Sequence, residues 1–144
     1  MTELEQFAGT WKLVSLESRR GDEVFHPLGQ DCKGILFLDA GGVLSVQLMK
    51  PKRPSFASGD DLNGTDAEIR AAYQGFLAAW GRYSVDEAEG RLRYRVEGSL
   101  FPNWVGTDQE RWYELEGDRL TLTTPQIVVR GKATVSALIW ERIA

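Results

Sequence analysis

Short segments of alternating polarity, separated by turns that contain glycine and aspartate, limit the folds open to this chain. In Arg91–Glu97, leucine, tyrosine and valine alternate with arginine and glutamate, so the apolar side chains share one face of a β-strand. The connections Asp39–Gly42, Asp86–Gly90 and Glu116–Asp118 are short, and each contains a glycine that can take positive φ. Strands joined by such turns pair with their neighbours in antiparallel fashion, which predicts a β-meander.

Eight segments of this kind occur along the 144 residues. The predicted strands are Thr10–Glu17, Lys33–Asp39, Val43–Met49, Gly81–Asp86, Arg91–Glu97, Gln109–Glu116, Arg119–Thr124 and Thr134–Arg142. Because closure of a sheet removes its exposed edges, we expect an all-β fold, an eight-stranded antiparallel up-and-down β-barrel, in a single domain over residues 1–144. A barrel of eight strands is about the size that can hold one small ligand.

One segment departs from the strand pattern and predicts an inserted α-helix. Across Gly64–Trp80, apolar residues recur at spacings of three and four, and Thr65 with Glu68 forms a capping-box sequence at the start. The pattern leaves open whether this helix plugs the barrel or lies against its side. A short helix is also expected over Glu3–Phe7, just before the first strand.

The charge and the scarce residue types exclude several classes of function. A net charge of -4 argues against nucleic acid as a partner. A single cysteine, Cys32, allows no intrachain disulfide, and a single histidine, His26, allows no two-histidine metal site. The acidic run at Asp60, Asp61 and Asp66 lacks calcium-loop spacing, so we expect neither a metal nor another cofactor. Without a basic leader or a long apolar span, we expect no secretory signal, no membrane insertion and a cytoplasmic location.

The strand Gln109–Glu116 carries the strongest functional signal. One of its faces holds three glutamates, which cannot all be buried without partners, so the other face must point inward. That face places Gln109, Arg111 and Tyr113 inside the barrel. An inward Arg111 either binds an acidic or carbonyl group of a ligand, or pairs with an internal carboxylate, or extends to solvent at the barrel end.

Other inward positions suggest a cavity that is apolar with a few polar groups. Tyr94 shares its face with aliphatic residues, and Leu120, Leu122 and Thr124 point inward on a later strand. In Val43–Met49 either face fits the interior, although the leucine and valine face makes the drier core. Such a cavity is typical of a small-molecule site, but bulky side chains that simply fill the barrel fit the same pattern.

The sequence SLFPNWVGTDQ, residues 99–109, is too long and too rich in proline, asparagine and glycine for a tight hairpin. We expect a structured loop at one end of the barrel, with Phe101 and Trp104 folded over that end. These two aromatic residues then serve either as a structural cap or as the mouth of a site. Exposed Trp104 or Trp112 also leaves a homodimer interface open.

The motif GTW at Gly9–Trp11, together with Arg142 in the terminal IWERIA, resembles the ends of lipocalin-like, or calycin, barrels. The resemblance implies that Trp11 lies at the closed end and that Arg142 packs over it in a cation–π contact. Most of the chain, and SLFPNWVGTDQ above all, is similar to one family of small bacterial and fungal lipocalin-like proteins. That family often has histidine where this chain has Tyr94, so acid–base chemistry through such a histidine is not expected here.

These observations favour binding of a small hydrophobic or amphipathic ligand that bears an acid or a carbonyl group. The candidate ligand-binding residues are Arg111, Tyr94, Tyr113, Gln109, Trp104 and Phe101. The resemblance also admits a cyclase, isomerase or dehydratase in the same cavity, with Tyr94 or Tyr113 as general acid and Arg111 stabilising an oxyanion. A dry barrel that acts through its surface is a third option.

Overall fold

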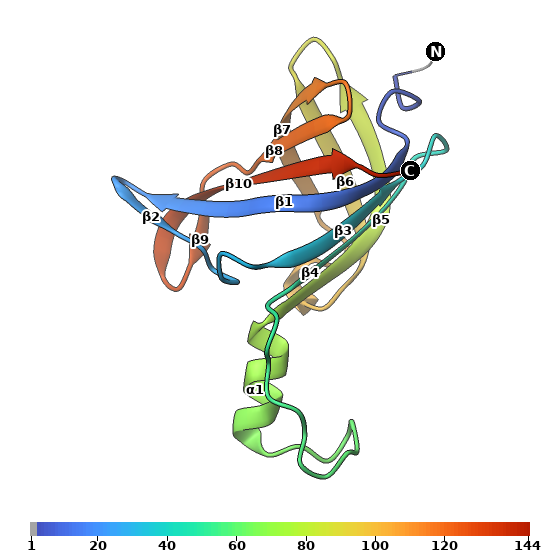
Figure 1. Ribbon diagram of the computed structural model, residues 1–144. Helices are drawn as coiled ribbons and strands as arrows, with labels where there is room; N and C mark the ends of the chain where they lie inside the picture. The colour runs from blue at the N-terminus through green and yellow to red at the C-terminus, as the bar shows by residue number, and fades with distance from the viewer. Residues whose placement is uncertain (1–2) are drawn as a thin grey trace.

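Ten antiparallel strands form one sheet that closes on itself in the computed structural model, which describes residues 3–144 (Figure 1). Residues 1 and 2, at the start of the predicted domain, lie outside the described range. The strands are β1 (Gly9–Arg20), β2 (Glu23–Phe25), β3 (Lys33–Leu38), β4 (Val43–Met49), β5 (Phe76–Asp86), β6 (Arg91–Ser99), β7 (Asp108–Glu116), β8 (Arg119–Thr123), β9 (Ile127–Val129) and β10 (Lys132–Arg142).

Eight of these strands make the ring, which confirms the predicted antiparallel barrel. Each pairs with its neighbour in the order β1-β3-β4-β5-β6-β7-β8-β10, and β10 pairs back onto β1 from Trp11↔Arg142 to Arg19↔Val135. The two short strands β2 and β9, which the sequence did not predict, extend the ends of β1 and β10 away from the ring. They lengthen one rim of the barrel (Figure 1).

Alternation along the strands decides which side chains fill the interior. On β4 the apolar face is inside: Leu44, Val46 and Leu48 are buried, while Ser45 and Gln47 bond to each other away from the core. Buried residues also alternate with more exposed ones along β6 and β8. The core therefore consists of aliphatic and aromatic side chains from the strands of the ring.

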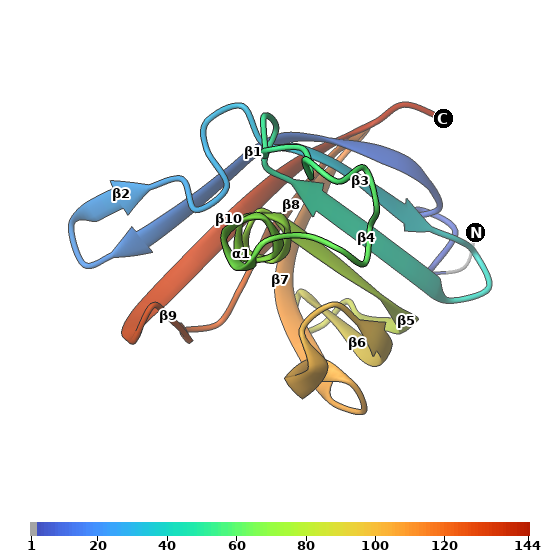
Figure 2. The same cartoon turned by 90° about the horizontal axis from the view of Figure 1, so that it is seen from below.

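The predicted helix is present but shorter than expected. Helix α1 spans Asp66–Gln74, begins with the predicted capping box at Thr65 and ends at Gly75. The apolar residues from Phe76 to Trp80 belong to β5 instead, because backbone bonding to β4 outweighs their helical spacing. α1 buries none of its residues and extends away from one end of the barrel, so it neither plugs the interior nor covers the side (Figures 1 and 2).

The N-terminal segment 3–7 forms consecutive turns rather than the predicted short helix. The amide of Phe7 donates to the carbonyl of Leu4 at 3.0 Å, and the ring of Phe7 is fully buried. A short 3-10 helix, η1 (Pro102–Trp104), shapes the predicted loop between β6 and β7. Within residues 3–144, no helix has the length and apolar character needed to cross a bilayer.

Trp11 and Arg142 close the end of the barrel where β1 begins and β10 ends (Figure 1). The Arg142 guanidinium lies 4.3 Å from the centre of the Trp11 ring, the cation–π geometry that the family resemblance implied. Its nitrogens donate to the carbonyl of Gln6 and to the carboxylate of Asp118, both at 2.9 Å. The Trp11 indole donates to the carbonyl of Phe7 at 3.0 Å. The side chains of Trp11 and Arg142, from the two ends of the chain, therefore stabilise this end of the barrel together.

Gly9 allows the chain ends to approach each other at this point. Its φ of 146° lies outside the range that other residues adopt easily. A Cβ atom at position 9 would lie 2.6 Å from the carbonyl oxygen of Ala144, which itself accepts the amide of Thr10 at 3.0 Å. A side chain at position 9 would therefore separate the first strand from the C-terminus.

Replacement of Arg142 by methionine is expected to destabilise the barrel by about 2 kcal/mol, because the cation–π contact and the bonds to partly buried carbonyls are lost together. Urea unfolding followed by circular dichroism measures this change. The matched control is Arg19→Met, which removes an exposed arginine paired with Glu17 and should shift the free energy of unfolding by less than about 0.5 kcal/mol. Equal effects of the two substitutions would contradict the proposed structural role of Arg142.

Candidate functional site

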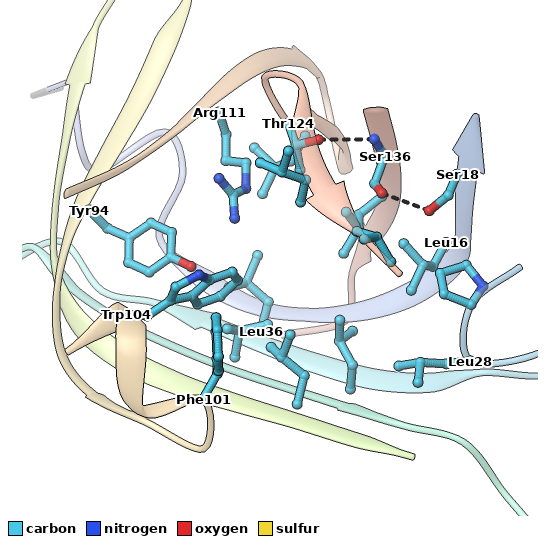
Figure 3. A pocket seen from close by; sticks show the side chains of 18 of the residues that line it. Leu16, Ser18, Leu28, Leu36, Tyr94, Phe101, Trp104, Arg111, Thr124 and Ser136 are labelled. Carbon is cyan, nitrogen blue, oxygen red and sulfur yellow. Dashed lines mark hydrogen bonds between the residues drawn. The ribbon is translucent and has the colours of Figure 1, made fainter. Parts of the chain in front are cut away.

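A cavity of about 400 Å³ occupies the barrel interior. It runs from the aliphatic core to the rim where Leu28, Gln74 and Val128 lie, at the end opposite the Trp11–Arg142 closure. Most of its lining consists of leucine, valine and aromatic side chains (Figure 3). This volume and this mixture of apolar walls with few polar groups are typical of a small-molecule site.

Arg111 brings a positive charge into this apolar cavity. Alternation along β7 turns its side chain inward, where it is 9% exposed. Its Nη1 donates to the backbone carbonyl of Glu110 at 2.7 Å, and no carboxylate of residues 3–144 forms an ion pair with it. Burial lowers the pKa of Arg111, but a guanidinium remains protonated at neutral pH. The cavity wall therefore holds a cation whose remaining N–H groups are free to bind an acceptor.

Tyr94 places a hydroxyl group beside this cation. It points inward from β6, is buried, and its ring centre lies 5.7 Å from the Arg111 guanidinium (Figure 3). Burial raises the pKa of Tyr94 above the ordinary tyrosine value, although the charge of Arg111 opposes this shift. The hydroxyl thus stays protonated at neutral pH, and no residue in the described range 3–144 accepts its proton.

Phe101 and Trp104 line the cavity near Arg111 and Tyr94. η1 positions them with ring centres 6.0 Å apart, and the Trp104 ring lies 6.0 Å from the Arg111 guanidinium. Trp104 is half-buried, whereas Phe101 is exposed. Both side chains face the cavity (Figure 3), which is compatible with either of the two options left by the sequence.

Two of the predicted ligand-binding residues lie elsewhere. Tyr113 is two residues closer to the closed end than Arg111 and packs edge-on against Phe7 at 4.9 Å. Gln109 lies toward the opposite end, where its amide donates to the Thr107 hydroxyl at 3.0 Å. Neither belongs to the cavity lining, so the candidate site keeps Arg111, Tyr94, Trp104 and Phe101.

Three hydroxyl groups on the opposite part of the lining add to the site. Ser18 and Ser136 were not predicted, and Thr124 was predicted only as an inward residue. The Ser18 and Ser136 hydroxyl oxygens lie 2.7 Å apart, and the Ser136 amide donates to the Thr124 hydroxyl at 2.9 Å (Figure 3). The alternation of Thr134, Ser136 and Leu138 along β10 contains the signal that would have placed Ser136 inside.

The remaining candidates have ordinary surroundings. His26 bonds through Nδ1 to the carbonyl of Leu16 at 3.0 Å and does not line the cavity. Asp60 accepts the amide of Leu62 in an exposed turn. Within residues 3–144, no three histidine, cysteine or acidic side chains gather at a common point that suits a metal ion. Trp112 is exposed and lies beneath the Arg91 guanidinium on the outer face of β7.

Comparison with known proteins agrees with this architecture. A family model described as a lipocalin-like domain matches residues 8–143. The chain is also similar to a 4'-hydroxy-3'-methoxypropiophenone carrier protein from Aspergillus oryzae. The two are 36% identical over 107 residues, which cover 69% of this chain and 96% of that protein.

The Arg111 charge should lower the stability of the protein when no ligand is bound. Arg111→Met removes a buried cation and replaces it with an apolar side chain of similar length, so it is expected to stabilise the free protein by about 1 to 3 kcal/mol. Urea unfolding in the absence of ligand measures the change. The control Arg93→Met removes an exposed arginine that pairs with Glu110 at 2.7 Å, and it should have little effect. Strong destabilisation by Arg111→Met would instead indicate that Arg111 serves the fold.

Proposed function

This chain belongs to the family of lipocalin-like domains, and from that premise we propose that it is a carrier of small aromatic carbonyl compounds or aromatic acids. The ligand lies in the barrel cavity, and its carbonyl or carboxylate oxygen accepts hydrogen bonds from Arg111 and Tyr94. Its apolar body packs against the aliphatic wall and against the aromatic rings of Phe101 and Trp104.

The observation that carries this proposal is the buried guanidinium with no carboxylate partner among residues 3–144. Removal of a charge from water costs several kcal/mol unless bonds to polar groups compensate for it. Arg111 has one such bond within the described chain, to a backbone carbonyl. A ligand oxygen would supply further bonds in a site of low dielectric constant, where each is stronger than in water.

We infer the class of ligand from the residues that line the cavity and from the name of the similar Aspergillus oryzae protein. The name of the Aspergillus oryzae protein states that it carries an aryl ketone with a hydroxyl and a methoxy group. An aryl ketone combines a flat apolar ring with one strong acceptor, which suits a cavity lined by Trp104, Phe101 and aliphatic side chains around the Arg111–Tyr94 pair. A volume of about 400 Å³ accommodates a molecule of this size.

A cyclase, isomerase or dehydratase in the same cavity is the alternative. Arg111 and Tyr94 resemble a donor pair that would polarise a carbonyl group, but proton abstraction beside that carbonyl also needs a base. Among residues 3–144, the lining includes no aspartate, glutamate or histidine side chain. The described site therefore supports binding better than enolisation.

Titration of the intrinsic tryptophan fluorescence tests the proposal, because Trp104 and Trp140 line the cavity. We expect propiophenone and 3-phenylpropanoic acid to quench the wild-type protein. Arg111→Met should weaken binding by roughly 10- to 100-fold, and Tyr94→Phe by a smaller factor of about 3 to 10, since a bond to a charged group is worth more than a neutral one.

Arg93→Met serves as the control in these titrations, because Arg93 lies on the outer face of the barrel and pairs with Glu110. Its affinity should equal that of the wild type. Unchanged affinity of Arg111→Met would remove the proposed role of Arg111, and quenching by neither probe would favour a dry barrel. If chromatography shows that the protein converts the ketone during incubation, that result would favour the cyclase, isomerase or dehydratase.

A further inference from the structure

Four polar side chains form a continuous row across four neighbouring strands of the cavity wall, which we call the polar belt: Arg111, Thr124, Ser136 and Ser18. Ser18 faces Ser136 in the pairing of β1 with β10. The pairing of Thr123 with Ala137 makes Thr124 the neighbour of Ser136, and the Thr124 amide donates to the Ser136 carbonyl at 2.8 Å.

The row continues from Thr124 to Arg111. β7 and β8 pair through Trp112 and Thr123, so the next step in the same register sets Arg111 opposite Thr124. All four side chains line the cavity, and Figure 3 shows the labelled residues along one arc of its wall. The polar groups are thus ordered: a cation at one end of the belt and hydroxyl groups along the rest.

The hydroxyl groups of the belt have donor capacity that the described chain does not use. The Thr124 oxygen accepts the Ser136 amide, but no residue among 3–144 accepts the Thr124 hydroxyl proton. Ser18 and Ser136 share one hydrogen bond, so only one of their two protons is engaged. These residues are 1% (Ser18), 5% (Thr124) and 8% (Ser136) exposed, and buried hydroxyl groups normally find partners for their protons.

We propose that Thr124, Ser136 and Ser18 form a second recognition site, which binds an oxygen atom at the end of the ligand remote from Arg111. This inference rests on the proposed function and specifies its ligand: an aromatic carbonyl compound or acid that carries a second oxygen, such as a phenolic hydroxyl group. A ligand that lacks this oxygen leaves the belt hydroxyls desolvated without a partner, so the site discriminates against it.

The spacing of the belt suits such a ligand. Neighbouring strands lie about 4.7–4.9 Å apart, so the three hydroxyl positions stand roughly 5 to 14 Å from Arg111 along the wall. A benzene ring with oxygen functions on opposite sides falls within this range. The wall beside the belt is aliphatic, with Leu36 and Leu122 among its residues, and it provides the surface on which the ring would pack.

The test compares propiophenone with its para-hydroxy derivative by fluorescence titration and by calorimetry. We expect the wild-type protein to bind the para-hydroxy derivative about tenfold more tightly. In the double variant Ser18→Ala with Ser136→Ala, that ratio should fall to within about twofold of one, while propiophenone still binds. The double change removes both partners of the serine pair, which limits its cost to the fold.

Ser45→Ala is the matched control, because Ser45 is a strand serine that bonds to Gln47 outside the cavity; it should keep the tenfold ratio. If the double variant does not fold, the wild-type ratio itself decides, and equal affinities for the two ketones overturn the second site. Retention of the ratio in a folded double variant also overturns it. Failure of both ketones to bind the wild-type protein would overturn the inference, and failure of 3-phenylpropanoic acid as well would overturn the proposed function.

Discussion

The pairing of β10 with β1 is the constraint on which the rest of this structure depends. It joins the first and last long strands, closes the ring of eight strands and converts a meander into a tube. The Trp11–Arg142 contact seals one end of that tube, while the other end is bordered by short strands, a loop and the base of α1. Between the walls, the described residues 3–144 leave a cavity of about 400 Å³.

Closure also explains how polar groups come to be arranged in the interior. In a closed sheet each inward side chain has an inward neighbour on both adjacent strands, so single polar residues on consecutive strands merge into a row. Arg111, Thr124, Ser136 and Ser18 occupy such a row. The belt has a charged group at one end and hydroxyl groups along the rest, so its two ends differ in chemistry. The wall of an apolar barrel of the same size would have no such difference.

The buried polar groups of the cavity cost the free protein stability. A dry interior of leucine and valine would be more favourable for the free protein than one that contains an unpaired guanidinium and unused hydroxyl protons. Tyr94 and Trp104 lie near the Arg111 charge and lessen its cost through their ring faces, but they do not neutralise it. The unmet bonding capacity of these groups is what a ligand with well-placed oxygens would satisfy.

The amino-acid sequence by itself determined the barrel and the inward direction of Arg111, because strand periodicity and glycine turns act locally and three glutamates could not share the buried face. It also determined the start of α1, through the capping box at Thr65 and Glu68. Only the tertiary structure decided where that helix ends, since the pairing of Phe76–Trp80 with β4 is a long-range interaction. Likewise, the separation of Tyr113 and Gln109 from the cavity, and the meeting of Ser18 with Ser136 across 118 positions of the chain, follow from the register of closure, which no local pattern encodes.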